Sequence, residues 1–156
     1  MSATTERSIT VTVNGTTYER EVEPRKLLIH FVRDDLDLTG SHIGCDTGNC
    51  GACSVIVDGT LVKSCMMLAV QADGATIESV EGLADGDELN KLQESFREHH
   101  ALQCGYCTPG MLMSATALLR ANPHPSDDEI KKALQGNICR CTGYWNIYEA
   151  VKAASE

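Results

Sequence analysis

The placement of its cysteines constrains what this chain can fold into more than any other feature of the sequence. All eight fall into two groups of four, separated by a long segment that contains none. The groups are Cys45, Cys50, Cys53 and Cys65, then Cys104, Cys107, Cys139 and Cys141. Two domains sharing 156 residues would each have a thin apolar core, and such small domains often rely on bound metal. We therefore expect one metal site in each half of the chain.

Composition and charge are those of an acidic globular protein. Hydrophobic residues make up 42% and charged residues 22%, and the formal net charge of −9 argues against a nucleic-acid partner. No apolar run approaches the roughly 20 residues of a membrane-spanning helix, so we expect no transmembrane segment. Residues 1–7 are polar and show no signal-peptide pattern. The expected compartment is the cytoplasm, where cysteines stay reduced and serve as metal ligands more readily than as disulfides.

The first half of the chain has the pattern of short strands with one helix. Asn14-Gly15 and Asp58-Gly59 are strong hairpin signals, each flanked by residues that favour strands. The strands are expected at residues 9–13, 16–18, 54–57, 60–62, 67–70 and 76–80. Apolar residues at helical spacing predict a helix near residues 25–34. This half is therefore predicted to be a small α+β domain.

The second half has the pattern of helices, and the glycine-containing segment 82–86 marks the change. Thr108 is a suitable N-cap before Pro109, and Ser126 opens a capping box with Glu129. Helices are expected near residues 87–98, 108–122, 126–134 and 147–151. The whole chain is predicted to be α+β, with a first domain at 1–82 and a second, helical domain at 83–156.

The first cysteine group has the spacing of a plant-type [2Fe–2S] ferredoxin. Cys45, Cys50 and Cys53 form a C-x4-C-x2-C loop, and Cys65 follows after eleven intervening residues. Three thiolates from one loop can surround a compact cluster, while the fourth closes the site from another element. Glycines in the loop allow backbone N–H groups to approach the sulfur atoms. Zinc and disulfides are the alternatives, but a three-cysteine, glycine-rich loop is atypical of zinc sites.

The second cysteine group is ambiguous by itself. Cys104 and Cys107 form a C-x2-C pair just before an expected helix N-terminus, where the helix dipole favours thiolates. Cys139 and Cys141 form a C-x-C pair expected in a loop between helices. Spacing alone permits either zinc or iron. The neighbouring iron–sulfur domain favours a second [2Fe–2S] cluster, because two clusters in one chain can exchange electrons.

Three segments together resemble a known family. They read GCDTGNCGAC at 44–53, QCGYCTPG at 103–110 and GNICRCTGY at 136–144. The combination is similar to the iron–sulfur subunit of molybdenum hydroxylases, the xanthine oxidase family, over residues 8–155. Within this family, the segments that most resemble the small subunit of aerobic carbon monoxide dehydrogenase are 27–33, 38–47 and 62–67.

This resemblance implies a β-grasp, plant-ferredoxin-like N-terminal domain and a C-terminal four-helix domain. It implies two partners, a large subunit with a molybdenum pterin cofactor and a medium subunit with FAD, assembled as a dimer of heterotrimers. Electrons would pass from molybdenum to the second cysteine group, then to the first, and on to FAD. Gln103 and Cys141 would lie beside the pterin, and this chain would carry no catalytic residue or substrate site of its own.

Several alternatives remain open at the level of sequence. The substrate of the complex could be carbon monoxide, an aldehyde or an N-heterocycle, because this chain does not touch it. A free-standing two-cluster ferredoxin and a zinc-stapled binding module are the readings outside the enzyme class. The protein could also associate with the inner face of the membrane through its partners.

Overall fold

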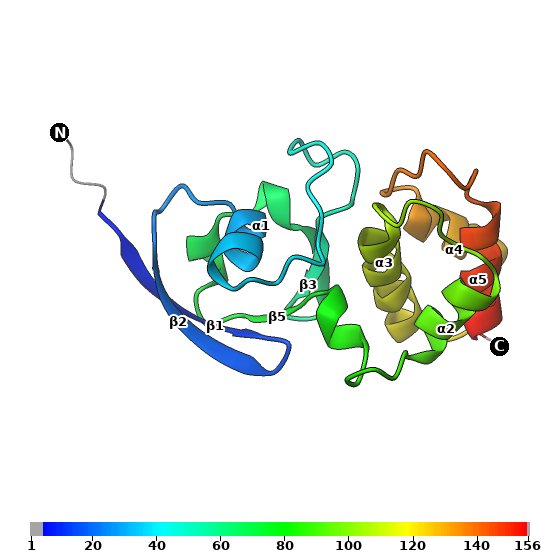
Figure 1. Cartoon of the computed structure of the whole chain (residues 1–156), viewed down its shortest axis with the longest axis horizontal. Coiled ribbons are helices and arrows are strands. Elements are labelled where there is room, and N and C mark those ends of the chain that lie inside the picture. Colours follow the sequence, from blue (N-terminus) through cyan, green and yellow to red (C-terminus); the bar gives the residue numbers. More distant parts are fainter. Residues whose placement is uncertain (1–4, 156) are drawn as a thin grey trace.

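The computed structural model describes residues 5–155, which form two lobes that lie side by side (Figure 1). The lobe on the left holds a five-stranded sheet with helix α1 (Leu28–His30), and the lobe on the right holds four longer helices. The α+β class expected from the sequence is confirmed. Residues 1–4, part of the segment expected to lack a signal peptide, lie outside the described residues, as does residue 156.

The sheet is built from two hairpins and one further strand. Its strands are β1 (Arg7–Val13), β2 (Thr16–Val22), β3 (Ser54–Val57), β4 (Thr60–Lys63) and β5 (Thr76–Glu78). Both expected hairpins are confirmed, and Asn14-Gly15 and Asp58-Gly59 have positive φ at both positions, as type I′ turns require. The spatial order is β2-β1-β5-β3-β4, because β5 pairs parallel with β1 and antiparallel with β3.

Two expectations for this lobe were wrong in detail. The helix expected near 25–34 begins only at Leu28 and continues as a π-helix over Phe31–Asp35. The backbone N–H of Leu28 donates to the Met67 carbonyl at 2.7 Å, so the residues just before the helix are held extended. Residues 67–70 do not form the expected strand, because Leu68 makes only an isolated antiparallel bridge with Leu27 before the chain enters a 3-10 helix at Ala69–Ala72.

The second lobe contains four helices, as expected from the sequence. They are α2 (Lys91–Glu98), α3 (Thr108–Ala121), α4 (Asp127–Leu134) and α5 (Trp145–Ser155). The capping box of Ser126 and Glu129 is confirmed, and a second box of Asn90 and Gln93 starts α2 later than expected. The expected N-cap role of Thr108 was wrong, since its hydroxyl has no hydrogen-bond partner among the described residues and the preceding cysteine takes the cap position. No helix within residues 5–155 is long and apolar enough to cross a membrane.

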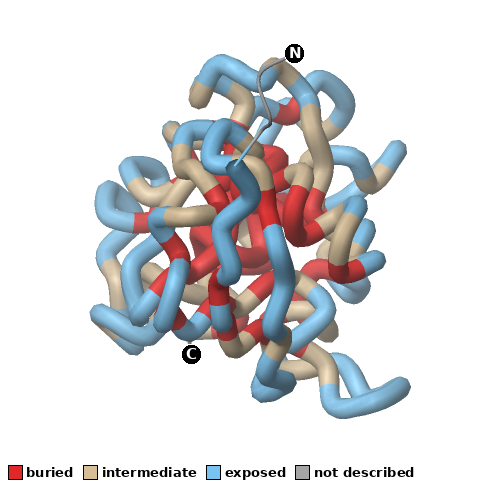
Figure 2. The backbone as a smooth tube through the Cα atoms, turned by 90° about the vertical axis from the view of Figure 1, so that its left-hand side faces the viewer, coloured by how far each residue is buried: buried red, intermediate tan, exposed pale blue. Residues whose placement is uncertain are grey.

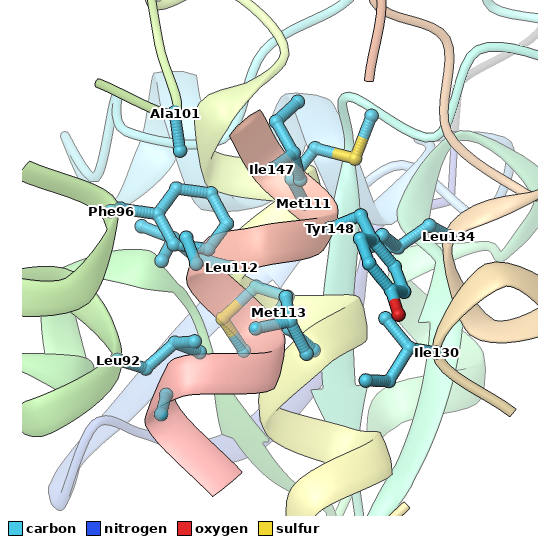
Figure 3. Close-up of a cluster of buried hydrophobic side chains, with 14 of the residues drawn as sticks. Leu92, Phe96, Ala101, Met111, Leu112, Met113, Ile130, Leu134, Ile147 and Tyr148 are labelled. Carbon is cyan, nitrogen blue, oxygen red and sulfur yellow. The ribbon is translucent and has the colours of Figure 1, made fainter. Parts of the chain in front are cut away.

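Each lobe packs around its own apolar core, and Figure 2 shows buried backbone enclosed by exposed segments. In the helical lobe, all four helices contribute to the core (Figure 3). Its fully buried large side chains include Phe96 of α2, Met111 and Met113 of α3, Ile130 of α4 and Ile147 of α5. This core fixes the loops at the helix ends, which carry the second cysteine group.

Helix α3 joins the two lobes. It packs against β3, whose Ile56 belongs to the core of the helical lobe. Near the C-terminal end of α3, both guanidinium NH2 groups of Arg120 donate to the carboxylate of Glu78 on β5, each at 2.8 Å. This donation lowers the pKa of Glu78 below its ordinary value of 4.5, so the pair is charged at neutral pH.

We expect the pair of Arg120 and Glu78 to contribute modestly to the stability of the contact between the lobes. The two side chains are 51% and 33% exposed. A double-mutant cycle with Arg120→Met and Glu78→Gln, measured by urea unfolding at pH 7, should give a coupling of about 0.5–1 kcal/mol. Because the pKa of Glu78 is depressed on folding, the coupling is complete above pH 4.5 and lost as the pH falls through the depressed value. A coupling that grows on acidification would contradict this prediction.

Candidate metal centres

The first cysteine group converges from one loop and one short helix. The loop between the π-helix and β3 carries Cys45, Cys50 and Cys53, while Cys65 follows β4 in a 3-10 helix at Ser64–Met66. All four are free thiols, and Cys53 and Cys65 are buried. Direct contacts pair Cys45 with Cys50 and Cys53 with Cys65. The structure thus brings together the four residues that the spacing predicted.

The loop backbone curls around Cys45. Gly48 and Gly51 have φ values of 74° and 73°, in the left-handed region that favours glycine. The Sγ atom of Cys45 accepts from the N–H groups of Thr47 at 3.4 Å and Cys50 at 3.3 Å. The Thr47 side chain and then these N–H groups lower the pKa of Cys45 to about 6. The lowered pKa favours the thiolate form of Cys45, which is the form that binds metal.

Two other thiols of this group, Cys50 and Cys65, have raised pKa values and ionise less readily than a free thiol. Burial raises the pKa of Cys50. Burial, followed by contact with Cys53, raises the pKa of Cys65 to about 11. Thiolates are the form that binds metal, so a positively charged iron centre would offset the cost of placing these sulfurs together. The iron is thus expected to stabilise this loop as well as to occupy it.

The second cysteine group lines one cavity. Cys104 and Cys107 lie in the loop before α3, and Cys139 and Cys141 lie in the loop between α4 and α5. All four line a cavity of about 230 Å³, in which the thiols of Cys107 and Cys139 contact each other. The two interhelical loops therefore bring the C-x2-C and C-x-C pairs to one shared cavity.

Two neighbouring thiols in this cavity have opposite ionisation tendencies. Burial and the nearby Cys139 raise the pKa of Cys107 to about 12. Burial also acts to raise the pKa of Cys139, but hydrogen bonds from Thr142 and contact with Cys107 outweigh it, and the pKa is lowered. The Thr142 hydroxyl lies 3.1 Å from the Cys139 Sγ, and the Thr142 N–H donates to the same sulfur at 3.5 Å. Hydrogen bonds therefore favour Cys139 as a thiolate more than its neighbour Cys107.

Both donor sets fit a binuclear iron–sulfur cluster. In a [2Fe–2S] cluster each iron takes two cysteine thiolates, so the protein must supply pairs of sulfurs. The direct contacts that pair Cys45 with Cys50, Cys53 with Cys65 and Cys107 with Cys139 meet this requirement. Gly44 also leaves room, because a Cβ there would lie 2.9 Å from the Sγ of Cys50.

The loop of Cys45, Cys50 and Cys53 contacts the loop of Cys139 and Cys141 directly. Both rise from the same side of the molecule (Figure 1), and the N–H of Ile138 donates to the Cys50 carbonyl at 2.9 Å. Oriented to match all its partners, the buried amide of Asn137 donates to the carbonyls of Gly51 at 3.1 Å and Gly110 at 3.3 Å. Cys50 also lines the cavity of the second group. The two candidate centres are therefore neighbours, joined by one backbone hydrogen bond and by the side-chain amide of Asn137.

An aromatic pair links the loop of the first cysteine group to the other loop of the second group. The rings of His42 and Tyr106 stack with centroids 4.5 Å apart. The Tyr106 hydroxyl donates to the Ile43 carbonyl at 2.6 Å, and the His42 Nδ1 lies 2.8 Å from the Tyr106 carbonyl. This link ties the loop of the first cysteine group to the loop of Cys104 and Cys107.

Sequence reasoning found the cysteines but missed the residues that join them. Asn137, Tyr106 and His42 contact partners far away in the sequence, so no local spacing could reveal their roles. Gln103, expected beside the pterin of a partner, is exposed in the loop before α3, and Cys141 is also exposed. Both positions remain predictions about a partner.

The fold and the two thiol sets define a [2Fe–2S] protein, and comparisons with known proteins agree. Residues 11–88 match the family described as "2Fe-2S iron-sulfur cluster binding domain", and residues 79–152 match "[2Fe-2S] binding domain". Caffeine dehydrogenase subunit gamma of Pseudomonas sp. (strain CBB1) is 52% identical over 150 residues, covering 94% of this chain and 90% of that protein. The nicotine 6-hydroxylase small subunit of Paenarthrobacter nicotinovorans is 54% identical over 143 residues, covering 92% and 86%.

Among solved structures, the chain is similar to quinoline 2-oxidoreductase from Pseudomonas putida 86. The TM-score is 0.93 at 49% sequence identity, and the match covers 96% of this chain and 94% of that one. The chain belongs to the family of iron–sulfur small subunits of molybdenum hydroxylases. It is the electron-transfer subunit of a multi-subunit oxidoreductase.

Proposed function

We propose that this chain carries electrons from a molybdenum pterin cofactor on one partner subunit to FAD on another. The observation that carries the proposal is the direct contact of the two cysteine loops, where the Ile138 N–H donates to the Cys50 carbonyl at 2.9 Å. Bound [2Fe–2S] clusters supply one-electron oxidation and reduction. The chain holds them at adjacent sites and buries Cys53, Cys65 and Cys139 away from water.

The proposed ligands are the two complete cysteine groups. One cluster is assigned to Cys45, Cys50, Cys53 and Cys65, and the other to Cys104, Cys107, Cys139 and Cys141. The first group then belongs to a β-grasp, plant-ferredoxin-like domain over residues 1–82, and the second to a four-helix domain over residues 83–156. The separate apolar cores of the two lobes support this division.

The exposed surface beside each cysteine group suits contact with a partner subunit. Around the second group, Cys104 and Cys141 are exposed, as are the apolar side chains of Ile138 and Trp145, at 54% and 65%. Such a patch suits burial against a partner, and we place the molybdenum subunit here, with Gln103 and Cys141 toward the pterin. Met66, beside the first group and 66% exposed, suits a contact with the FAD subunit. A dimer of heterotrimers is the assembly we propose.

The names of the relatives bear on the substrate of the complex. Caffeine, nicotine and quinoline are all N-heterocycles. We infer that the complex hydroxylates an N-heterocycle with oxygen from water, releasing two protons and an electron pair that passes through this chain one electron at a time. Oxidation of carbon monoxide stays a prediction without support from these names; it was suggested by the resemblance of residues 27–33, 38–47 and 62–67. Aldehydes are the third substrate class to test.

Purification of the tagged chain from its native host tests the proposal. Two larger chains should copurify, with molybdenum, FAD, and about four iron atoms and about four labile sulfides per copy of this chain. The complex should then reduce an artificial dye with an N-heterocycle, and not with an aldehyde or carbon monoxide. A chain that purifies alone with both clusters would overturn the subunit role in favour of a free-standing ferredoxin. Dye reduction with carbon monoxide alone would overturn the substrate assignment.

A further inference from the structure

Hydrogen bonds close a small ring within the last cysteine loop. The Thr142 hydroxyl lies 3.1 Å from the Sγ of Cys139, and the N–H of Tyr144 donates to the Thr142 Oγ1 at 3.1 Å. In return, the N–H of Cys139 donates to the Tyr144 hydroxyl at 2.9 Å. Gly143 and Tyr144 both have left-handed backbones, with φ values of 67° and 70°, which turns the chain back on itself. Hydrogen bonds within residues 139–144 thus hold the Thr142 side chain against the Cys139 sulfur.

Proton accounting decides which atom donates once iron is bound. A threonine hydroxyl has one proton and two acceptor positions, and the Tyr144 N–H occupies one of the acceptor positions. A cysteine bound to iron is a thiolate and has no proton to give. At 3.1 Å, the hydrogen bond between Thr142 and the Cys139 sulfur must therefore run from the hydroxyl to the sulfur.

The first cysteine group shows a similar arrangement. The side-chain amide of Asn49 donates to the Thr47 Oγ1 at 2.9 Å, which occupies that oxygen as an acceptor. The N–H of Thr47 donates to the Cys45 Sγ at 3.4 Å. A threonine therefore lies directly beside one cysteine sulfur in each group, although at Cys45 the backbone N–H makes the hydrogen bond.

We propose that Thr142 is a positioning residue that raises the reduction potential of the second cluster through its hydrogen bond to Cys139. The inference rests on the proposed function, because it requires a [2Fe–2S] cluster on Cys139. A reduced cluster carries one more negative charge than an oxidised one, so a donor to its sulfur stabilises the reduced form more. The expected role is to make this cluster a better acceptor for electrons arriving from the partner.

Three variants at this position, Thr142→Val, Thr142→Ala and Thr142→Ser, separate the hydroxyl from the shape of the side chain. The midpoint potential of each cluster is measured by EPR-monitored redox titration of the full-length chain. Loss of the hydroxyl in the valine and alanine variants should shift the reduction equilibrium of one cluster about fivefold, equivalent to a fall of about 40 mV for a one-electron couple. The serine variant should stay near wild type, and the other cluster should not move in any variant.

Thr116→Val is the matched control. Thr116 lies in α3, and its buried hydroxyl has no hydrogen-bond partner within residues 5–155, so the same chemical change there should leave both potentials unchanged. Equal potentials in the wild type and in the alanine and valine variants would overturn the inference, as would an equal fall in the serine variant. Absence of a second [2Fe–2S] signal in the wild-type protein would instead overturn the proposed function, so the two failures are distinguishable.

Discussion

Replacing Cys107 with alanine should remove one of the two EPR signals of the reduced protein and halve its iron and sulfide content. Cys107 lines the cavity of the second group and contacts Cys139, so its loss leaves one iron with a single protein thiolate. Alanine is chosen because a serine oxygen could still bind iron. Iron analysis and EPR of the dithionite-reduced chain measure the result.

Cys53→Ala is the complementary variant. Cys53 is buried, contacts Cys65 and does not line the cavity of the second group, so its replacement should remove the other signal and spare the one lost in Cys107→Ala. If both variants lost the same signal, or if Cys107→Ala kept two signals and full iron, the assignment of ligands to two separate clusters would be wrong. A colourless wild-type protein loaded with zinc would contradict the assignment of both iron–sulfur clusters.

Gly51→Ala and Gly110→Ala should loosen the packing of the first cysteine loop against α3 and the Cys139 loop more than any other single-methyl change. A Cβ on Gly110 would lie far inside van der Waals contact with the Gly51 carbonyl. A Cβ on Gly51 would meet the Gly136 carbonyl and the Asn137 side chain, at a backbone φ of 73° that already disfavours alanine. Backbone atoms cannot move aside cheaply, so we expect a destabilisation of about 3 kcal/mol in each case.

The rate of cluster bleaching in urea measures this effect, because unfolding with loss of iron is irreversible. Both variants should lose visible absorbance at least about tenfold faster than the wild type. Gly136→Ala is the matched control from the same junction, since a Cβ there would make only ordinary contact with Lys63, 3.8 Å away. Wild-type bleaching rates in Gly51→Ala and Gly110→Ala would show that the loops do not depend on this contact.

The parts of the fold that the sequence predicted well are those decided between near neighbours. Asn14-Gly15 and Asp58-Gly59 produced the expected hairpins, because a type I′ turn depends on the two residues in it. Ser126 opened α4 for the same reason, as its capping box closes within one helical turn. The helix near 25–34 was misplaced because its start is set by a backbone bond to Met67, a distant partner.

By itself, the sequence determined the cysteine groups, the class of cluster in the first group and the order of strands before helices. These follow from spacing along the chain, since one loop must reach around one cluster. Only the tertiary structure showed that the two groups are adjacent. It also showed that Asn137 and Gly110 contact the first cysteine loop, and that the Thr142 hydroxyl hydrogen-bonds to the Cys139 sulfur. Such features depend on side chains meeting after α3 packs on the sheet, and only the packed core fixes that meeting.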